Sequence, residues 1–109
     1  MKNKIALLIG INYTNTSIKL KGSHNDILIM KKILSSHYNY LDENMIILID
    51  DENNIQPTKF NIITQLNYLY KQTKEKKIDE IYIHYSGHCD ISNKNKSIKY
   101  LLPQDYKQN

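Results

Sequence analysis

The stretch IALLIGI, residues 5–11, is a continuous apolar run between Lys4 and Asn12. A run of this length without polar alternation is typical of a β-strand that is covered on both faces. It is too short for a membrane helix, which needs about 18–20 apolar residues, and no small-residue cleavage site of a signal peptide follows it. The run therefore predicts a buried strand.

Amphipathic segments and further apolar runs follow this strand in alternation. Helices are expected from Ser23 to about Tyr40 and from Pro57 to about Tyr70, because apolar residues there recur every three to four positions. The expected apolar faces are Ile27, Met30, Ile33, Leu34 and His37 in the first helix, and Phe60, Ile63, Leu66, Leu69 and Tyr70 in the second. Strands are expected at residues 45–49, 78–85 and 97–102, with a polar loop at 90–96. Strands that alternate with helices indicate a parallel sheet with right-handed crossovers, here in one α/β domain over residues 1–109.

The composition limits the partners that can be expected. The net charge of +4 is carried by scattered lysines, and the chain has no arginine. Because nucleic-acid sites favour the planar fork of arginine, no nucleic-acid partner is predicted, and no apolar run is long enough to predict a membrane partner. The single cysteine, Cys89, excludes an internal disulfide framework and indicates a reducing, cytoplasmic location.

Polar residues gather directly after three of the predicted strands. They are Asn12-Tyr13, Asp50-Asp51 and Ser86-Gly87-His88-Cys89. Open parallel sheets bind ligands outside the carboxyl ends of their strands, so a site is expected there. His88 can act as a general base, since imidazole titrates near neutral pH, but a loop histidine bonded to a carbonyl is an equally good interpretation.

Cys89 and the Asp50-Asp51 pair have simpler explanations than catalysis. Adjacent side chains on an extended segment point to opposite faces, so His88 cannot easily take the proton of Cys89. The thiol is therefore expected to be a small buried group that fills a gap. Asp50-Asp51 is expected to be a solvated turn.

Asp26 and its neighbours also have a structural interpretation. Asp26 follows Ser23 by three positions, which is the spacing of a helix capping box. The alternative is an acidic pocket for a basic substrate side chain. His24, Asp26 and His88 lack the spacing of a metal-ligand motif, so no metal site is predicted.

Several segments, taken in order, resemble one family. They are KIALLIGINYTNTSIKLKGSHNDI (4–27), DENMIILIDD (42–51), QPTKFNI (56–62), IDEIYIHYSGHCD (78–90) and YLLPQDY (100–106). Together they resemble the amino-terminal, histidine-bearing part of the catalytic domain of metacaspases, which are caspase-like cysteine peptidases. The resemblance implies a caspase-like (flavodoxin-like) three-layer α/β/α fold with a mostly parallel sheet, truncated before the strand that carries the nucleophile.

The resemblance also assigns roles to individual residues. His88 falls on the catalytic histidine, and Gly87 and Cys89 fall on the oxyanion-hole loop, where metacaspases usually have glycine after the histidine. Asp26 falls on the aspartate that pairs with the substrate's Lys or Arg, and Ser23 and Ser86 lie beside that pocket. No cofactor is predicted for this chain, although calcium is possible in a complete family domain.

The expected function is therefore a cysteine-type endopeptidase domain that cleaves peptide or protein substrates after Lys or Arg. In caspases the nucleophilic cysteine lies roughly 50 residues after the histidine, and no cysteine follows Cys89, so the chain alone is expected to be inactive. The alternative is a non-catalytic caspase-like module that binds a second caspase-like chain, as a homodimer or by capture of a peptidase, through an open sheet edge. A third hypothesis is an unrelated flavodoxin-like ligand-binding domain.

Overall fold

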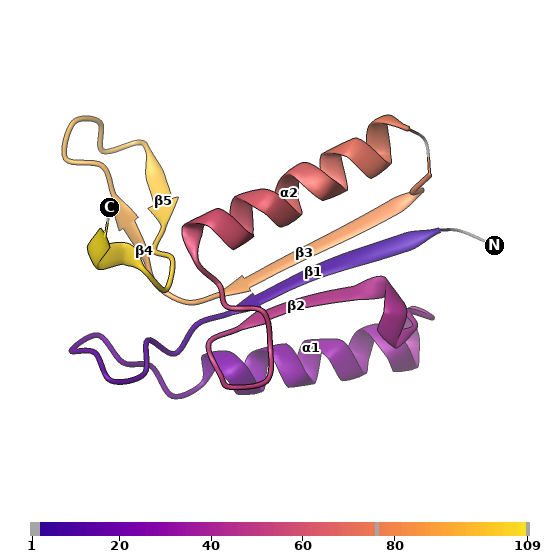
Figure 1. Ribbon diagram of the computed structural model, residues 1–109, viewed down its shortest axis with the longest axis horizontal. Helices are drawn as coiled ribbons and strands as arrows, with labels where there is room; N and C mark the ends of the chain where they lie inside the picture. Colours follow the sequence, from indigo (N-terminus) through magenta and orange to yellow (C-terminus); the bar gives the residue numbers. More distant parts are fainter. Residues whose placement is uncertain (1–2, 76, 109) are drawn as a thin grey trace.

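Three parallel strands form the centre of the protein (Figure 1). The computed structural model describes residues 3–75 and 77–108. Strand β1 (Lys4–Gly10) lies between β2 (Met45–Ile49) and β3 (Glu80–Ser86), and both neighbours are parallel to it. The run that begins at Ile5 is thus the central strand, and its apolar side chains are buried on both faces. The mostly parallel α/β sheet predicted from the sequence is confirmed.

The two helices cover opposite faces of this sheet (Figure 1). Helix α1 (Ser23–His37) packs through Ile27 and Leu34 against the face that carries Ala6 and Leu8 of β1. Helix α2 (Lys59–Lys74) packs against the other face, which carries alternate residues of β1 such as Leu7. The layers are therefore α/β/α, as the resemblance implied.

Gly10 explains how α1 comes to start beside the end of β1. A Cβ atom at Gly10 would lie 2.6 Å from Cγ1 of Ile27 and 2.9 Å from the carbonyl oxygen of Ser23. The absence of a side chain therefore lets the first turn of α1 approach the strand end closely. This approach places the first turn of α1 at the carboxyl edge of the sheet.

The predicted helix cap is wrong. The N-cap residue is Gly22, without a side-chain cap bond, and the backbone N–H of Ser23 donates to Oδ1 of Asn12 at 3.0 Å. A side chain from the loop after β1 thus accepts the hydrogen bond from Ser23, so no capping box forms with Asp26. In α2 the N-cap is Thr58, whose hydroxyl accepts the N–H of Asn61, so the helix begins after Pro57.

The predicted apolar faces of the helices are only partly right. The buried residues of α2 are Ile62 and Leu69, while four of the five predicted residues are exposed: Phe60, Ile63, Leu66 and Tyr70. In α1, Ile27 and Leu34 are buried, but Ile33 and His37 are exposed. The sheet has three strands among the described residues, and so narrow a sheet covers only the central stripe of each helix.

After β3 the chain leaves the parallel sheet and forms a hairpin. Strand β4 (Cys89–Ile91) pairs antiparallel with β5 (Lys99–Leu101), in a separate two-stranded sheet. The strand expected at 97–102 is therefore shorter, and part of the expected loop at 90–96 belongs to β4. The hairpin lies at the carboxyl end of the parallel sheet, near the start of α2 (Figure 1), where the N–H of Gln104 donates to the carbonyl of Pro57.

Two short 3₁₀ helices complete the described structure, η1 (Asp42–Asn44) before β2 and η2 (Tyr106–Gln108) after the hairpin. In the part of the chain that the structure describes, no helix combines the length and apolar character that a membrane span requires.

Candidate functional site

The carboxyl edge of the sheet brings Asp26 and Ser86 together. Gly10 pairs with Ser86 across β1 and β3, and the first turn of α1 packs against Gly10. The hydroxyl of Ser86 donates to Oδ2 of Asp26 at 2.7 Å. Asp26 is exposed and Ser86 is partly buried, so the bonded carboxylate also faces solvent. Ser23 lies in the same turn, but it is only 3% exposed, and its contact with a substrate stays a prediction.

His88 lies two residues beyond Ser86, and its imidazole is held by the loop after β1. Nε2 of His88 lies 2.7 Å from the carbonyl oxygen of Ile18. Because a carbonyl can only accept, Nε2 must carry the proton in this contact, and the neutral ring then has its basic lone pair on Nδ1. The ring of Tyr13 stacks against the imidazole, with ring centroids 4.9 Å apart and planes tilted by 37°.

The main chain of His88 is held by two tyrosine hydroxyls. The N–H of His88 donates to Oη of Tyr13 at 2.9 Å, and Oη of Tyr85 donates to the carbonyl of His88 at 2.6 Å. Burial raises the pKa of both phenols above the usual 10.0. Both hydroxyls are therefore neutral near pH 7 and can each donate one proton.

Gly87 is needed for space at this point. A Cβ atom on Gly87 would lie 2.8 Å from Oη of Tyr85 and 3.0 Å from Oη of Tyr13. The two phenols thus fill the volume that a side chain would need, and only glycine fits without displacing them.

Asp50 supports the other side of Tyr13, and its expected place in a solvated turn is wrong. Its side chain is 2% exposed. Oδ1 accepts the N–H of Asn12 at 2.9 Å, Oδ2 accepts the N–H of Tyr13 at 2.8 Å, and Nε2 of His24 lies 2.5 Å from Oδ1. These bonds hold Tyr13 at a φ of 53°, in the left-handed region that a bulky residue rarely adopts.

Asp51, in contrast, does form the predicted turn. Its carboxylate accepts the backbone N–H of Asn53 at 2.9 Å and the side-chain amide of Asn54 at 3.0 Å. Partial burial would raise the pKa of Asp51, but these hydrogen bonds outweigh it and lower the pKa.

Cys89 is exposed, so its expected role as a buried gap filler is wrong. It begins β4, and adjacent side chains on extended backbone are expected to lie on opposite faces. Among the described residues, positive φ occurs outside glycine only at Tyr13, Asn15 and Asn39. The replacement of the family's usual glycine by Cys89 therefore does not strain the backbone.

The predicted residues do not form a metal centre in the described part of the chain. No group of three or more His, Cys, Asp or Glu side chains lies together there. His24 contacts Asp50, whereas Asp26 accepts the hydroxyl of Ser86.

Comparisons with known proteins identify the family of this chain. Residues 4–109 match the family model for the metacaspase, peptidase C14 domain. The chain belongs to the metacaspase family. It is 44% identical over 88 residues to metacaspase-1 of Eremothecium gossypii, covering 79% of this chain and 19% of that protein. It is 45% identical over 85 residues to metacaspase-1A of Aspergillus oryzae, covering 76% of this chain and 20% of that protein.

The chain spans about a fifth of the length of the curated metacaspases that it matches. The matched family model is that of a peptidase C14 domain. The matched range contains every residue that was predicted for the site, but the catalytic and binding roles of those residues stay predictions.

Four residues that contact the candidate site had no role assigned from the sequence: Tyr13, Ile18, Asp50 and Tyr85. The sequence placed Tyr13 and Asp50 after buried strands, where a site was expected, but it gave neither residue a role. Ile18 acts through its carbonyl group, which carries no side-chain signal.

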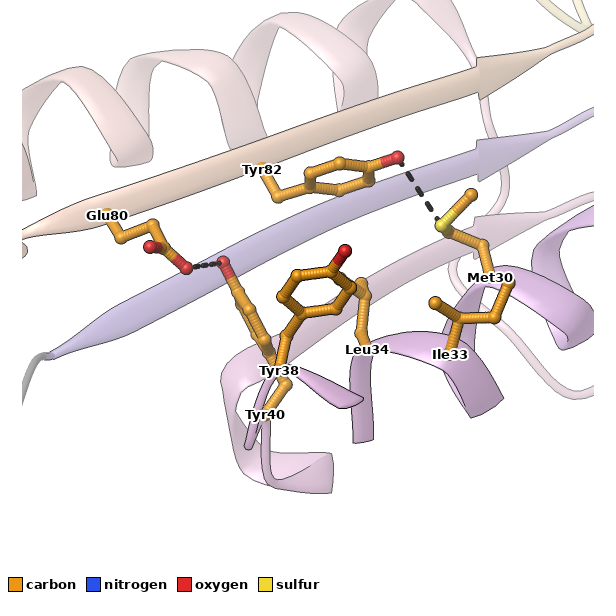
Figure 2. A pocket seen from close by; sticks show the side chains of 7 residues that line it. All are labelled: Met30, Ile33, Leu34, Tyr38, Tyr40, Glu80 and Tyr82. Carbon is orange, nitrogen blue, oxygen red and sulfur yellow. Dashed lines mark hydrogen bonds between the residues drawn. The ribbon is translucent and has the colours of Figure 1, made fainter. Parts of the chain in front are cut away.

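A separate cavity of about 420 Å³ lies between α1 and β3 and contains none of the predicted site residues (Figure 2). In it, the hydroxyl of Tyr40 donates to Glu80 at 2.8 Å, and that of Tyr82 donates to Sδ of Met30 at 3.3 Å. Nζ of Lys4 lies 3.8 Å from the Glu80 carboxylate. The chain itself thus supplies the cation that this carboxylate could attract.

Proposed function

We propose that this metacaspase chain supplies the general base of a cysteine-type endopeptidase that cleaves after Lys or Arg, and that His88 is this base. The contact between Nε2 of His88 and the carbonyl of Ile18 carries the proposal. It selects the tautomer whose free lone pair lies on Nδ1, so one nitrogen orients the ring and the other can accept a proton. A general base needs this combination of a fixed ring and a basic nitrogen.

In the reaction, Nδ1 of His88 takes the proton of a cysteine thiol, and the thiolate attacks the scissile carbonyl carbon. The imidazolium then gives this proton to the leaving amine as the C–N bond breaks. Cys89 does not suit the part of the nucleophile, because it is exposed and because adjacent side chains on extended backbone are expected to lie on opposite faces. We therefore propose that the thiol comes from outside these 109 residues, and that the chain alone is inactive.

The pair of Asp26 and Ser86 is the proposed pocket for the basic substrate side chain. Ser86 fixes one carboxylate oxygen of Asp26 at 2.7 Å, and in the described part of the chain no lysine or histidine forms an ion pair with Asp26. An arginine guanidinium or a lysine ammonium can pair with this carboxylate. At an exposed position such a pair contributes only about 0.2–1 kcal/mol, so weak binding is expected from these contacts alone.

The backbone N–H of Cys89 is the proposed donor to the oxyanion of the tetrahedral intermediate. Antiparallel pairs alternate between hydrogen-bonded and non-hydrogen-bonded positions. The bonds from Leu102 N to His88 O and from Ser92 N to Ile98 O mark the hydrogen-bonded positions, so the pair of Cys89 and Leu101 is non-hydrogen-bonded. The N–H of Cys89 therefore points away from β5 and towards the outside of the hairpin, where it could donate to an oxyanion.

Peptide binding tests the substrate pocket. The ¹⁵N-labelled chain is titrated with blocked peptides that end in Arg, Lys or norleucine, and backbone amide shifts are followed by NMR. Saturable shifts at Asp26 and Ser86 are expected with Arg and Lys but not with norleucine, and Asp26→Asn should remove them. Asp42→Asn, which removes one exposed carboxylate before β2, is the matched control and should leave binding unchanged. Equal shifts with all three peptides would contradict the pocket.

Turnover tests the catalytic assignment. The chain alone, with and without calcium, is expected to leave fluorogenic Arg and Lys peptides uncleaved. Cleavage that is lost in both His88→Ala and Cys89→Ala would show that Cys89 is the nucleophile after all, and the proposal that the thiol comes from elsewhere would be wrong.

A second candidate function is self-association through β3. This strand is an edge of the parallel sheet, and Ile83 at its centre is 50% exposed. Exposed strand edges recruit partners by strand addition, and the partner that we propose is a second copy of this chain. Light scattering after size exclusion should show a dimer that Ile83→Lys disrupts, whereas Ile98→Lys, at an equally exposed position of the hairpin (52%), should not. A monomer at high micromolar concentration would contradict this function.

A further inference from the structure

The hairpin pairing is interrupted at His88, where a tyrosine hydroxyl replaces a main-chain contact. At a hydrogen-bonded position of an antiparallel pair, two residues exchange both N–H···O bonds. The N–H of Leu102 donates directly to the carbonyl of His88 at 3.1 Å. The reciprocal bond runs through Oη of Tyr13, which accepts the N–H of His88 at 2.9 Å and donates to the carbonyl of Leu102 at 2.6 Å.

Tyr85 completes this arrangement from the neighbouring position. Its hydroxyl lies 3.1 Å from that of Tyr13 and donates to the carbonyl of His88 at 2.6 Å. Each phenol has one proton: that of Tyr13 goes to Leu102, and that of Tyr85 goes to His88. The N–H and the carbonyl of His88 are thus each bonded to a different side-chain hydroxyl.

Tyr13 also builds the loop that holds the imidazole. Its carbonyl accepts the N–H of Thr16 at 3.1 Å and the Thr16 hydroxyl at 2.6 Å. The same hydroxyl accepts the N–H of Ile18 at 3.3 Å, and the carbonyl of Ile18 contacts Nε2 of His88. One residue therefore contacts His88 through its hydroxyl and its ring, and through the loop that binds Nε2.

We infer that Tyr13 is the positioning residue of His88, and that its hydroxyl opens the hairpin on the N–H side of His88. In a regular antiparallel ladder the N–H of His88 would bond directly to the carbonyl of Leu102. Here the Tyr13 oxygen lies between them, so two hydrogen bonds replace one. The carbonyl of His88 still bonds directly to the N–H of Leu102. The connection through the Tyr13 oxygen holds the His88 backbone at the position from which the imidazole reaches the Ile18 carbonyl. The catalytic meaning of this inference rests on the proposed function of His88, but the positioning itself can be tested without any activity.

The test is NMR of the chain with Tyr13→Phe, which keeps the ring and removes only the oxygen. Two-bond ¹H–¹⁵N spectra report the tautomer of the His88 ring, and hydrogen exchange reports the His88 amide. Exchange at the amides of Leu7 and Leu8 in β1 serves as the reference for global opening. Tyr100→Phe is the matched control, since Tyr100 lies in β5 and is 46% exposed.

In Tyr13→Phe we expect the His88 amide to exchange at least tenfold faster relative to the Leu7 and Leu8 amides, and the His88 ring to lose its uniform Nε2–H tautomer. Tyr100→Phe should change neither. If His88 exchange rises only as much as the reference and the tautomer is unchanged, Tyr13 is a core residue without a positioning role.

The unchanged protein offers a second measurement, in case the variant does not fold. The hydroxyl proton of Tyr13 should exchange slowly and show a nuclear Overhauser effect to the His88 amide proton. Its absence would overturn the inference. A failure of the proposed function is distinguishable, because Arg peptides would then leave Asp26 and Ser86 unaffected while these signals persist.

Discussion

Asp50→Asn tests whether a buried carboxylate supports the loop that carries Tyr13. The two oxygens of Asp50 accept N–H groups from consecutive residues, Asn12 on Oδ1 and Tyr13 on Oδ2, at 2.9 and 2.8 Å. Asparagine has the same shape but only one acceptor oxygen. Its NH₂ group would face one of these N–H donors, which leaves that donor unpaired next to a second donor.

The expected loss follows from these contacts. A hydrogen bond to a charged group contributes about 1.5–3 kcal/mol, and a buried donor left unsatisfied costs about 1–3 kcal/mol. The backbone of Tyr13 is also in the left-handed region, a conformation that costs roughly 1–2 kcal/mol. The hydrogen bonds to Asp50 hold the backbone in this conformation. We expect Asp50→Asn to lower the free energy of unfolding by about 2–4 kcal/mol. Because a domain of this size is stable by roughly 5–15 kcal/mol, the variant should still fold.

Urea denaturation followed by far-ultraviolet circular dichroism measures this difference. The matched control is Asp51→Asn, which makes the same chemical change one residue later, in the polar turn. Since Asp51 is only partly buried, water can replace much of a lost hydrogen bond, and we expect a loss of only about 1 kcal/mol there. If the two variants lose equal stability, the bonds from Asp50 do not support the loop and this reasoning is refuted.

Three further predictions concern the glycines, the thiol and the phenols. Gly10→Ala should lower the free energy of unfolding, measured by urea denaturation, by about 1–3 kcal/mol, because its Cβ would lie 2.6 Å from a side-chain carbon of α1. A Cβ at Gly22 would meet nothing within 4 Å, so the control Gly22→Ala should lower it by less than about 0.5 kcal/mol. Cys89 should react with a disulfide reagent as fast in the folded chain as in the urea-unfolded chain at the same pH, since it is exposed; strong protection would contradict its placement. Burial raises the pKa of Tyr13 and Tyr85 above 10.0, so the folded chain keeps protons that the unfolded chain releases. The free energy of unfolding should therefore be fully present below pH 10 and fall above it, and Tyr85→Phe should flatten that fall in melts from pH 9 to 12.

The central part of the fold could be predicted because burial on both faces leaves a direct mark on a strand. The run from Ile5 to Ile11 is apolar at every position except Gly10, and only a central strand with a helix layer on each side requires this. The helix faces could not be predicted equally well. Several apolar stripes lie side by side on α2, and which one meets the sheet depends on the width of the sheet, which no local pattern contains.

The site was predictable to the extent that it follows from strand direction. Parallel strands end at the same edge, so Ser86 at the end of β3 had to lie near the loop after β1. The role of Tyr13 could not be predicted, because its hydroxyl meets His88 75 positions later in the chain, and only after the hairpin folds back. Asp50 was misassigned because two adjacent aspartates indicate a solvated turn, although the Asp50 side chain is buried beneath it.

The adjacency of His88 and Cys89 is explained by the geometry of β4. Extended backbone alternates its side chains, so the half-buried imidazole faces the loop after β1 and the thiol faces solvent. The ladder alternates as well, so the position that exposes the thiol is also the one whose N–H points away from β5. The same alternation therefore makes Cys89 unsuitable as a partner for His88 and suitable as a backbone donor. The direction of the side chain and the direction of the N–H at residue 89 both follow from the extended backbone, so cysteine in place of glycine changes neither.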